Sequence, residues 1–255
     1  MNINEITKKF IDGEVNESAE VYLFCFVHSG NWPRIFDRFT VKLEENICVL
    51  PLNFPGKSER LDEKPYDSIE VMAKSAAYFI NSISGSKRIV FWGDELGAIC
   101  AFRTSQLMKK DYGKEPERLI VGGIVPPQLV RENSKDLHKL SDEDFVAYVR
   151  GVENKPPCVE RFVNDDEMMS FIMESIKADF KAMETYEYDP SIKLSCPINV
   201  LYGTKEESLE IVENWKDVTT GETVYKSFNN VRMLLQDLDM TEPISQYVND
   251  TINCG

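Results

Sequence analysis

Short apolar runs alternate with stretches of helical spacing along most of the chain, and this alternation limits the folds open to it. Six segments have the length and composition of strands, and most are apolar almost throughout. A strand that is apolar on both faces is typical of a parallel sheet covered by helices on both sides. The alternation therefore predicts an α/β fold, with strands at residues 21–28, 47–52, 88–93, 118–125, 198–203 and 223–228.

Helices are expected in the segments between these strands. From Ser68 the apolar residues fall three and four positions apart, which predicts a helix with Ser68 as its N-cap. Residues 1–19 form a mostly polar segment that precedes the first predicted strand. The predicted helices cover residues 32–43, 68–83, 95–110, 208–216 and 242–252.

Residues 128–190 interrupt this alternation. They contain helical patterns at residues 142–149, 166–176 and 177–186 and no convincing strand. An insertion between two strands of an α/β sheet usually covers the ligand-binding ends of the strands. We therefore predict a core formed by residues 1–127 and 191–255, with a helical lid over residues 128–190.

The formal net charge of −14 argues against two classes of partner. It repels a nucleic-acid backbone and an anionic membrane, and no apolar stretch approaches the roughly 20 residues that a membrane helix needs. The six cysteines include no CxxC pair, so a disulfide framework is not expected. The first residues lack the apolar segment of a signal peptide, and we expect a cytoplasmic protein without a metal or cofactor.

The segment FWGDELGAIC carries the strongest functional signal in the chain. A strand leads into it, a helix leaves it, and Gly93 and Gly97 flank Glu95 at two residues on either side. This spacing is that of the nucleophile elbow, G-x-S-x-G, which lifts one side chain above the sheet at a helix N-terminus. The elbow pattern is present, but a glutamate stands where the serine is expected.

The motifs around this elbow resemble those of the type II thioesterases of nonribosomal peptide and polyketide assembly lines. LFCFVHSGNW is similar to their first-strand motif LFCFPHAGGS and includes the family histidine as His28. The segment LNFPGKSERL resembles their Q-L-P-G-R-x-E-R loop, and ADFKAMETYEY resembles A-D-F-x-x-x-E-x-Y-x-Y. KLSDEDF and PINVLYG match two further motifs, so the resemblance covers roughly residues 20–236. It implies an α/β-hydrolase fold.

The same resemblance shows that all three positions of the catalytic triad have changed. The family elbow is G-H-S-M-G, so Asp94 replaces its histidine and Glu95 its serine. The acid that follows the next-to-last strand corresponds to Glu206. The histidine that ends the family motif F-x-G-G-H-F corresponds to Arg232.

These replacements restrict the chemistry. Acyl transfer through serine needs a hydroxyl nucleophile and a base whose pKa is near neutrality. Glu95 has no hydroxyl, and an arginine such as Arg232 stays protonated at physiological pH. Neither His28 nor His138 lies at the position of the catalytic histidine, Cys100 is expected to pack in the core, and Ser29 has no evident base.

Two roles remain open for the charged residues at the triad positions. Glu95 is a candidate general base if burial raises its pKa. Alternatively, Glu95, Arg232 and Glu206 form an ion-pair chain that compensates the buried carboxylate. The resemblance also implies that Ser29 and Leu96 supply the backbone amides of an oxyanion hole, with His28 ordering that loop.

Four residues of the predicted lid have an ordinary structural interpretation. A solvated helical face is favoured for Asp179 and Glu184 over a role in the site, and packing is favoured for Tyr186 and Tyr188 over contact with a ligand.

Three functions are consistent with the sequence. The first, which the altered triad favours, is a thioesterase relative that binds a carrier protein, an acyl-pantetheine arm or an assembly-line enzyme without serine catalysis. The second is an enzyme in which Glu95 acts as acid or base on a biosynthetic thioester or its product. The third is a residual thioesterase with a mechanism that does not use serine.

Overall fold

A computed structural model describes residues 3–152, 157–162, 164–205 and 207–253. Within these residues six strands form one parallel sheet in the order β2-β1-β3-β4-β5-β6. The prediction of an α/β fold with a parallel sheet is confirmed. The strands are β1 (Val21–Phe26), β2 (Ile47–Pro51), β3 (Arg88–Asp94), β4 (Arg118–Gly122), β5 (Ile198–Gly203) and β6 (Thr223–Phe228).

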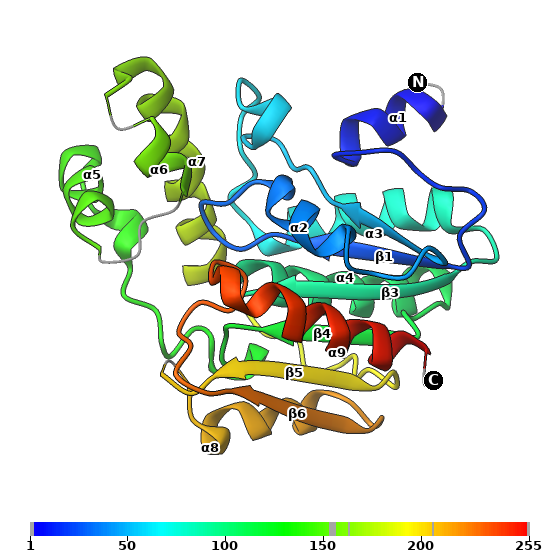
Figure 1. Cartoon of the computed structure of the whole chain (residues 1–255). Coiled ribbons are helices and arrows are strands. Elements are labelled where there is room, and N and C mark those ends of the chain that lie inside the picture. Colours follow the sequence, from blue (N-terminus) through cyan, green and yellow to red (C-terminus); the bar gives the residue numbers. More distant parts are fainter. Residues whose placement is uncertain (1–2, 153–156, 163, 206, 254–255) are drawn as a thin grey trace.

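Helices cover both faces of this sheet (Figure 1). On one face, α3 (Ile69–Ser84) and α4 (Leu96–Tyr112) pack against the strands together with α8 (Leu209–Val212). On the other face lie α2 (Asp37–Thr40) and α9 (Thr241–Asn253). Short 3-10 helices continue or connect these elements, at Pro33–Phe36, Ser58–Arg60, Pro127–Leu129, Leu137–Lys139, Glu213–Val218 and Leu238–Met240.

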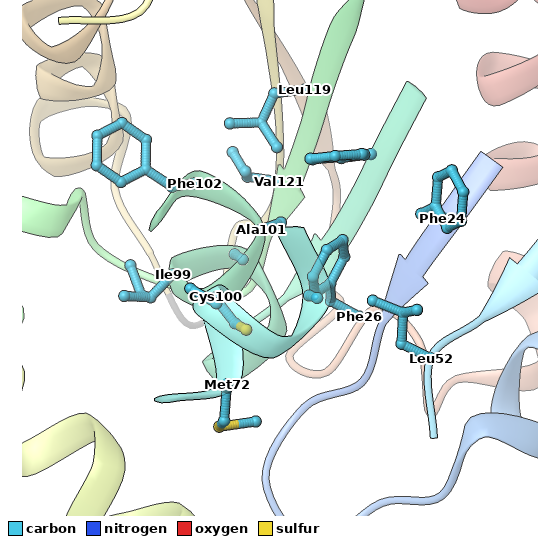
Figure 2. Close-up of a cluster of buried hydrophobic side chains, with 14 of the residues drawn as sticks. Phe24, Phe26, Leu52, Met72, Ile99, Cys100, Ala101, Phe102, Leu119 and Val121 are labelled. Carbon is cyan, nitrogen blue, oxygen red and sulfur yellow. The ribbon is translucent and has the colours of Figure 1, made fainter. Parts of the chain in front are cut away.

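The larger core cluster lies between the sheet and α3 and α4 (Figure 2). Phe24 and Phe26 of β1 are fully buried there, and Ile99 and Phe102 come from α4. Cys100 is part of the same cluster, which confirms that it packs in the core. Packing in this cluster holds the first turn of α4 against the carboxyl ends of β1 and β3.

Two predicted strands end earlier than their apolar runs. The runs continue to residues 28 and 125, whereas β1 ends at Phe26 and β4 at Gly122. After β4 the chain turns at Gly123, whose φ of +63° is unfavourable for other residues. The apolar residues beyond these points belong to loops at the carboxyl edge of the sheet, where Val27 is buried and Ile124 and Val125 are half-buried against the core.

The polar segment that precedes β1 contains a helix that the spacing of its apolar residues did not predict. Helix α1 (Ile3–Phe10) precedes β1, and the ring of Phe10 stacks on Phe79 of α3 at 4.9 Å. This tertiary contact stabilises a segment too short to be helical alone. Ser68 does precede α3, but its side chain makes no capping hydrogen bond.

The segment from residue 128 to residue 190, called the helical segment below, contains α5 (Asp142–Gly151), α6 (Pro157–Arg161) and α7 (Asp166–Glu184). The two helical patterns predicted at residues 166–186 form the single helix α7. In Figure 1 these helices stand at the ends of the strands, away from both faces of the sheet. Val149 of α5 and Phe180 of α7 line the same cavity as residues that follow β1 and β3. The division into core and lid domains remains a prediction.

Candidate functional site

The turn between β3 and α4 places Glu95 above the carboxyl edge of the sheet. Its backbone has φ 50° and ψ −116°, a region that L-residues rarely adopt. The Glu95 amide donates to the Gly122 carbonyl at 2.8 Å, and its carbonyl accepts from the Ala98 amide at 3.0 Å. These bonds hold the strained residue between the sheet and the first turn of the helix, as in a nucleophile elbow.

The two glycines of the elbow allow this turn because the backbones approach too closely for a side chain. A Cβ atom at Gly93 would collide with the carbonyl of Gly97. A Cβ atom at Gly97 would collide with the carbonyl of Phe26 at the end of β1. Both collisions are with backbone atoms, so no side chain can move to relieve them.

A backbone amide binds the carboxylate of Glu95. Ser29 donates its amide to Glu95 Oε2 at 2.8 Å, and the backbone of Leu96 acts to lower the pKa of the same carboxyl group. Ser29 and Leu96 are the residues whose amides were expected to form an oxyanion hole. A carboxylate therefore occupies the Ser29 donor, which could otherwise bind the oxygen of an acyl carbonyl.

The environment of Glu95 raises its pKa above the usual value for glutamate. Burial is the largest cause, and the negative charge of Asp179 acts in the same direction. Hydrogen bonds from Ser29 and Leu96 oppose this effect. The side chain is not fully enclosed, since 36% of its surface is exposed and it borders a cavity.

His28 lies beneath this carboxylate and is almost fully buried. Its Nδ1 is 3.1 Å from the Ser29 carbonyl, and its Nε2 is 2.6 Å from the side-chain amide of Asn31. A neutral ring with its proton on Nδ1 donates to the first and accepts from the second. Burial lowers the pKa of His28 to about 4, and the charge of Lys57 contributes. His28 therefore holds the loop as a neutral ring.

A buried ion pair ties the helical segment to the same loop. Asp179 Oδ2 on α7 accepts from Lys57 Nζ at 2.6 Å and from the Gly30 amide at 2.8 Å. The side chains of Lys57 and Asp179 are each 3% exposed. Cys158 of α6 donates its thiol to the Gly30 carbonyl at 3.0 Å. Both polar groups of Gly30 are thus bonded to the helical segment.

The predicted solvated face for Asp179 and Glu184 is wrong, because both side chains are buried. Glu184 accepts from the amides of Leu137 and His138 at 2.7 and 2.9 Å, and His138 Nδ1 lies 2.6 Å from Glu184 Oε2. Sequence spacing held a signal for Asp179. It lies seven residues after Ile172 and three after Ile176, so it falls on the apolar face of α7.

The cavity that reaches Glu95, called the chamber below, has a volume of about 300 Å³. An added Cβ atom at Gly123, on its wall, would lie 3.0 Å from Asp94 Oδ1, so the Asp94 carboxylate packs against the end of β4. Polar groups gather at the elbow end of the chamber, and most other lining side chains are apolar or aromatic. The described lining residues are His28, Ser29, Asp94, Glu95, Gly123, Tyr148, Val149, Val152, Ile176, Phe180, Met233, Leu234 and Gln236.

The predicted ion-pair chain through Arg232 and Glu206 stays a prediction. Arg232 is exposed, and no ion pair between Glu95 and Arg232 occurs in the part of the chain that the structure describes. Glu206 lies outside the described residues. The Ser29 amide is a group that stabilises the Glu95 carboxylate.

Packing is confirmed for the two tyrosines that follow α7. Tyr186 is buried in the larger core cluster, and Tyr188 packs against that cluster. The ring of Tyr188 lies 6.2 Å from that of Phe102 on α4. Neither tyrosine lines the chamber.

In the part of the chain that the structure describes, no group of three or more His, Cys, Asp or Glu side chains could hold a metal ion. None of the described helices combines the length and the apolar character that a membrane span needs. The titratable groups among the described lining residues of the chamber are His28, Asp94, Glu95 and Tyr148.

Comparison with solved structures supports the fold. A RedJ thioesterase from the prodiginine pathway of Streptomyces coelicolor superposes with a TM-score of 0.77 at 22% identity, covering 93% of this chain and 90% of that one. The type II thioesterase BorB from the borrelidin biosynthetic cluster superposes with a TM-score of 0.79 at 23% identity, covering 95% of each chain.

Comparison of sequences establishes the family. The thioesterase domain model matches residues 22–242. Thioesterase PikA5 of Streptomyces venezuelae is 30% identical over 222 residues, which cover 86% of this chain and 77% of PikA5. The gramicidin S biosynthesis protein GrsT of Aneurinibacillus migulanus is 26% identical, with 86% and 85% of the two chains covered. With its α/β-hydrolase sheet and its elbow between β3 and α4, this chain belongs to the thioesterase family, among the type II thioesterases.

Proposed function

We propose that this protein binds acyl-pantetheine groups on a carrier protein of a peptide or polyketide pathway and does not hydrolyse them by serine chemistry. The pathway follows from its relatives, since GrsT is named for gramicidin S biosynthesis and BorB comes from a borrelidin cluster. The chain would act as an accessory protein of an assembly line. The partner, which is a carrier protein or an assembly-line enzyme, is part of this proposal, and so are the acyl group and the pathway.

The observation that carries the proposal is the position of the Glu95 carboxylate. It accepts the Ser29 amide at 2.8 Å, which is a hydrogen bond that an acyl oxyanion would need in hydrolysis. Removal of one oxyanion-hole donor slows acyl transfer about 10²–10³-fold in a serine hydrolase. Here that donor is occupied, the hydroxyl nucleophile is replaced, and Arg232 stands at the place of the base.

The chamber supports a binding role. Its volume of about 300 Å³ lies at the lower end of the range for small-ligand sites. Val149, Ile176 and Phe180 give it apolar walls, and the polar groups converge at the elbow. This arrangement fits an apolar acyl group that packs between these walls.

One observation favours a second function, in which Glu95 is a general acid or base. Burial raises the pKa of Glu95, which moves it toward the range useful for proton transfer near neutral pH. The carboxylate also borders the chamber, where a substrate could reach it. The reaction would be proton abstraction, cyclisation or hydrolysis of a biosynthetic thioester or its product.

A carrier protein that bears a 4-methylpentanoyl-pantetheine arm tests the proposal. With an amide in place of the thioester, calorimetry should detect binding to the wild type and weaker binding to Met233→Trp, which fills the chamber. Leu238→Trp is the matched control, since Leu238 is 76% exposed and does not line the chamber. Equal binding by the wild type and both variants would show that the arm does not enter the chamber.

With the thioester itself, neither the wild type nor Glu95→Ser should release acid faster than buffer. The serine variant regains a hydroxyl but has no histidine base at the Arg232 position. Turnover by the wild type that is lost in Glu95→Ala would replace the binding proposal with the acid–base function.

A further inference from the structure

The charges around the chamber differ from those of a site built for an anion. Among the described lining residues there are two carboxylates, Asp94 and Glu95, and no lysine or arginine. His28 is neutral above a pKa of about 4, because it is buried. Glu95 therefore presents a carboxylate to a described lining that contains no basic side chain.

The buried cation Lys57 is already engaged elsewhere. It does not line the chamber, and its ammonium lies 2.6 Å from Asp179 Oδ2. Within the described residues, the one ion-pair contact of Glu95 is with His28, at 4.0 Å. The Ser29 amide stabilises the Glu95 carboxylate without cancelling its charge, so the carboxylate can still pair with a cationic ligand.

The aromatic lining of the chamber is also suited to a cation. Tyr148 of α5 and Phe180 of α7 belong to it, with their ring centroids 6.4 Å apart in an edge-to-face arrangement. Aromatic faces attract an ammonium group. Val149, Val152 and Ile176 add apolar contacts. The chamber thus combines an anionic end with aromatic and aliphatic walls.

We propose that the chamber selects ligands that carry a protonated amine next to a small apolar group, with the ammonium held by Glu95. A carboxylate has room for several donors, so Glu95 can accept the ammonium while it keeps the Ser29 amide. The inference rests on the proposed function only in taking the chamber as the ligand site. It assigns the ligand class through the residue that replaces the serine of the family elbow.

Three matched probes test this inference: the N-butylamides of leucine, of N-acetylleucine and of 4-methylpentanoic acid. The first carries an ammonium, the second masks it, and the third lacks it on the same carbon skeleton. In titrations followed by NMR, the leucine amide should bind the wild type about tenfold or more tightly than either neutral probe, as expected for a charge-assisted hydrogen bond.

The preference should depend on Glu95. In Glu95→Gln the leucine amide should lose its advantage to within about threefold, since the amide side chain has no charge. Glu174→Gln is the control, because Glu174 is an exposed acid on α7 that does not line the chamber, and this variant should keep the full preference. Equal binding of the three probes, or no binding of any, overturns the inference.

These probes contain no pantetheine, so their outcome is separate from that of the carrier-protein experiment. A preference for the ammonium, without binding of a carrier arm that bears leucine in place of the 4-methylpentanoyl group, would support the ligand class and refute the carrier. Binding of the carrier arm with no preference among the probes would do the reverse.

Discussion

At Glu95 the main chain adopts a conformation that costs about 1–3 kcal/mol for a residue with a side chain. The elbow of a serine hydrolase needs this conformation to present its nucleophile, and here it presents a carboxylate instead. Because the Glu95 backbone remains bonded to Gly122 and Ala98, the strain is sustained by the surrounding structure. The elbow geometry thus survives the loss of its serine.

Gly97→Ala should destabilise the protein even though alanine is the better helix former. The new Cβ atom would collide with the Phe26 carbonyl, and backbone on both sides cannot yield. We expect a loss of about 2–4 kcal/mol in the free energy of unfolding, measured with urea. Gly151→Ala, where no atom lies within 4 Å of the added Cβ, is the control and should change stability by less than about 1 kcal/mol. Equal effects at the two positions would contradict the packing described for the elbow.

His28 predicts a pH dependence of stability. Its pKa falls from 6.5 in a free chain to about 4 in the folded protein, because the ring is buried. Between these values the unfolded chain binds more protons, so stability is lost as pH falls. Between pH 7 and pH 5 this residue should remove about 2 kcal/mol from the free energy of unfolding.

The His28 contribution is measured as a difference. In urea unfolding of the wild type and of His28→Gln, the fall in stability from pH 7 to pH 5 should be about 2 kcal/mol smaller in the variant, since other groups contribute equally to both. Identical pH dependence of the two proteins would mean that His28 is not neutral and buried as described.

At the scale of elements, the helical segment and the loop after β1 form one unit. Asp179 of α7 accepts the Gly30 amide, and Cys158 of α6 donates to the Gly30 carbonyl. The amide of Ser29, next in the chain, binds Glu95. The position of the helical segment therefore affects the amide that holds the elbow carboxylate.

The Lys57–Asp179 pair predicts a strong coupling between two substitutions. Asp179→Asn keeps an acceptor for Gly30 but leaves the Lys57 ammonium buried without its counter-ion, which should cost about 3–5 kcal/mol. Adding Lys57→Met removes the uncompensated charge and should recover most of that loss. Urea unfolding of both single variants and the double variant measures the coupling, and additive losses would contradict the pair.

The elements of this fold were largely predictable, and the site only in part. Apolar runs marked the strands, because in a parallel sheet both faces are buried. Spacing alone did not reveal that Phe10 stacks on Phe79, or that Asp179 meets Lys57 across the molecule. Such contacts join residues far apart in the chain. A charged residue on a predicted helix is assigned to the solvated face when its buried partner is not known.

At the scale of the whole molecule, the fold brings four loops together at the carboxyl edge of the sheet and closes them with the helical segment. His28 follows β1, Glu95 follows β3, Gly123 follows β4 and Met233 follows β6. Motif resemblance placed His28 and Glu95 at one site, since loops at the ends of parallel strands share an edge. It did not indicate that Glu95 would accept the Ser29 amide, because that depends on side-chain direction.

We propose that the elbow carboxylate makes this thioesterase relative a binding protein, so the protein should not speed the release of an acyl group. A single-turnover assay measures this, in which excess protein is mixed with a 4-methylpentanoyl carrier-protein thioester and the released acid is quantified by mass spectrometry. Acid should appear at the rate seen in buffer, for the wild type and for Glu95→Ala alike. Faster release by the wild type that disappears in Glu95→Ala would overturn the proposal.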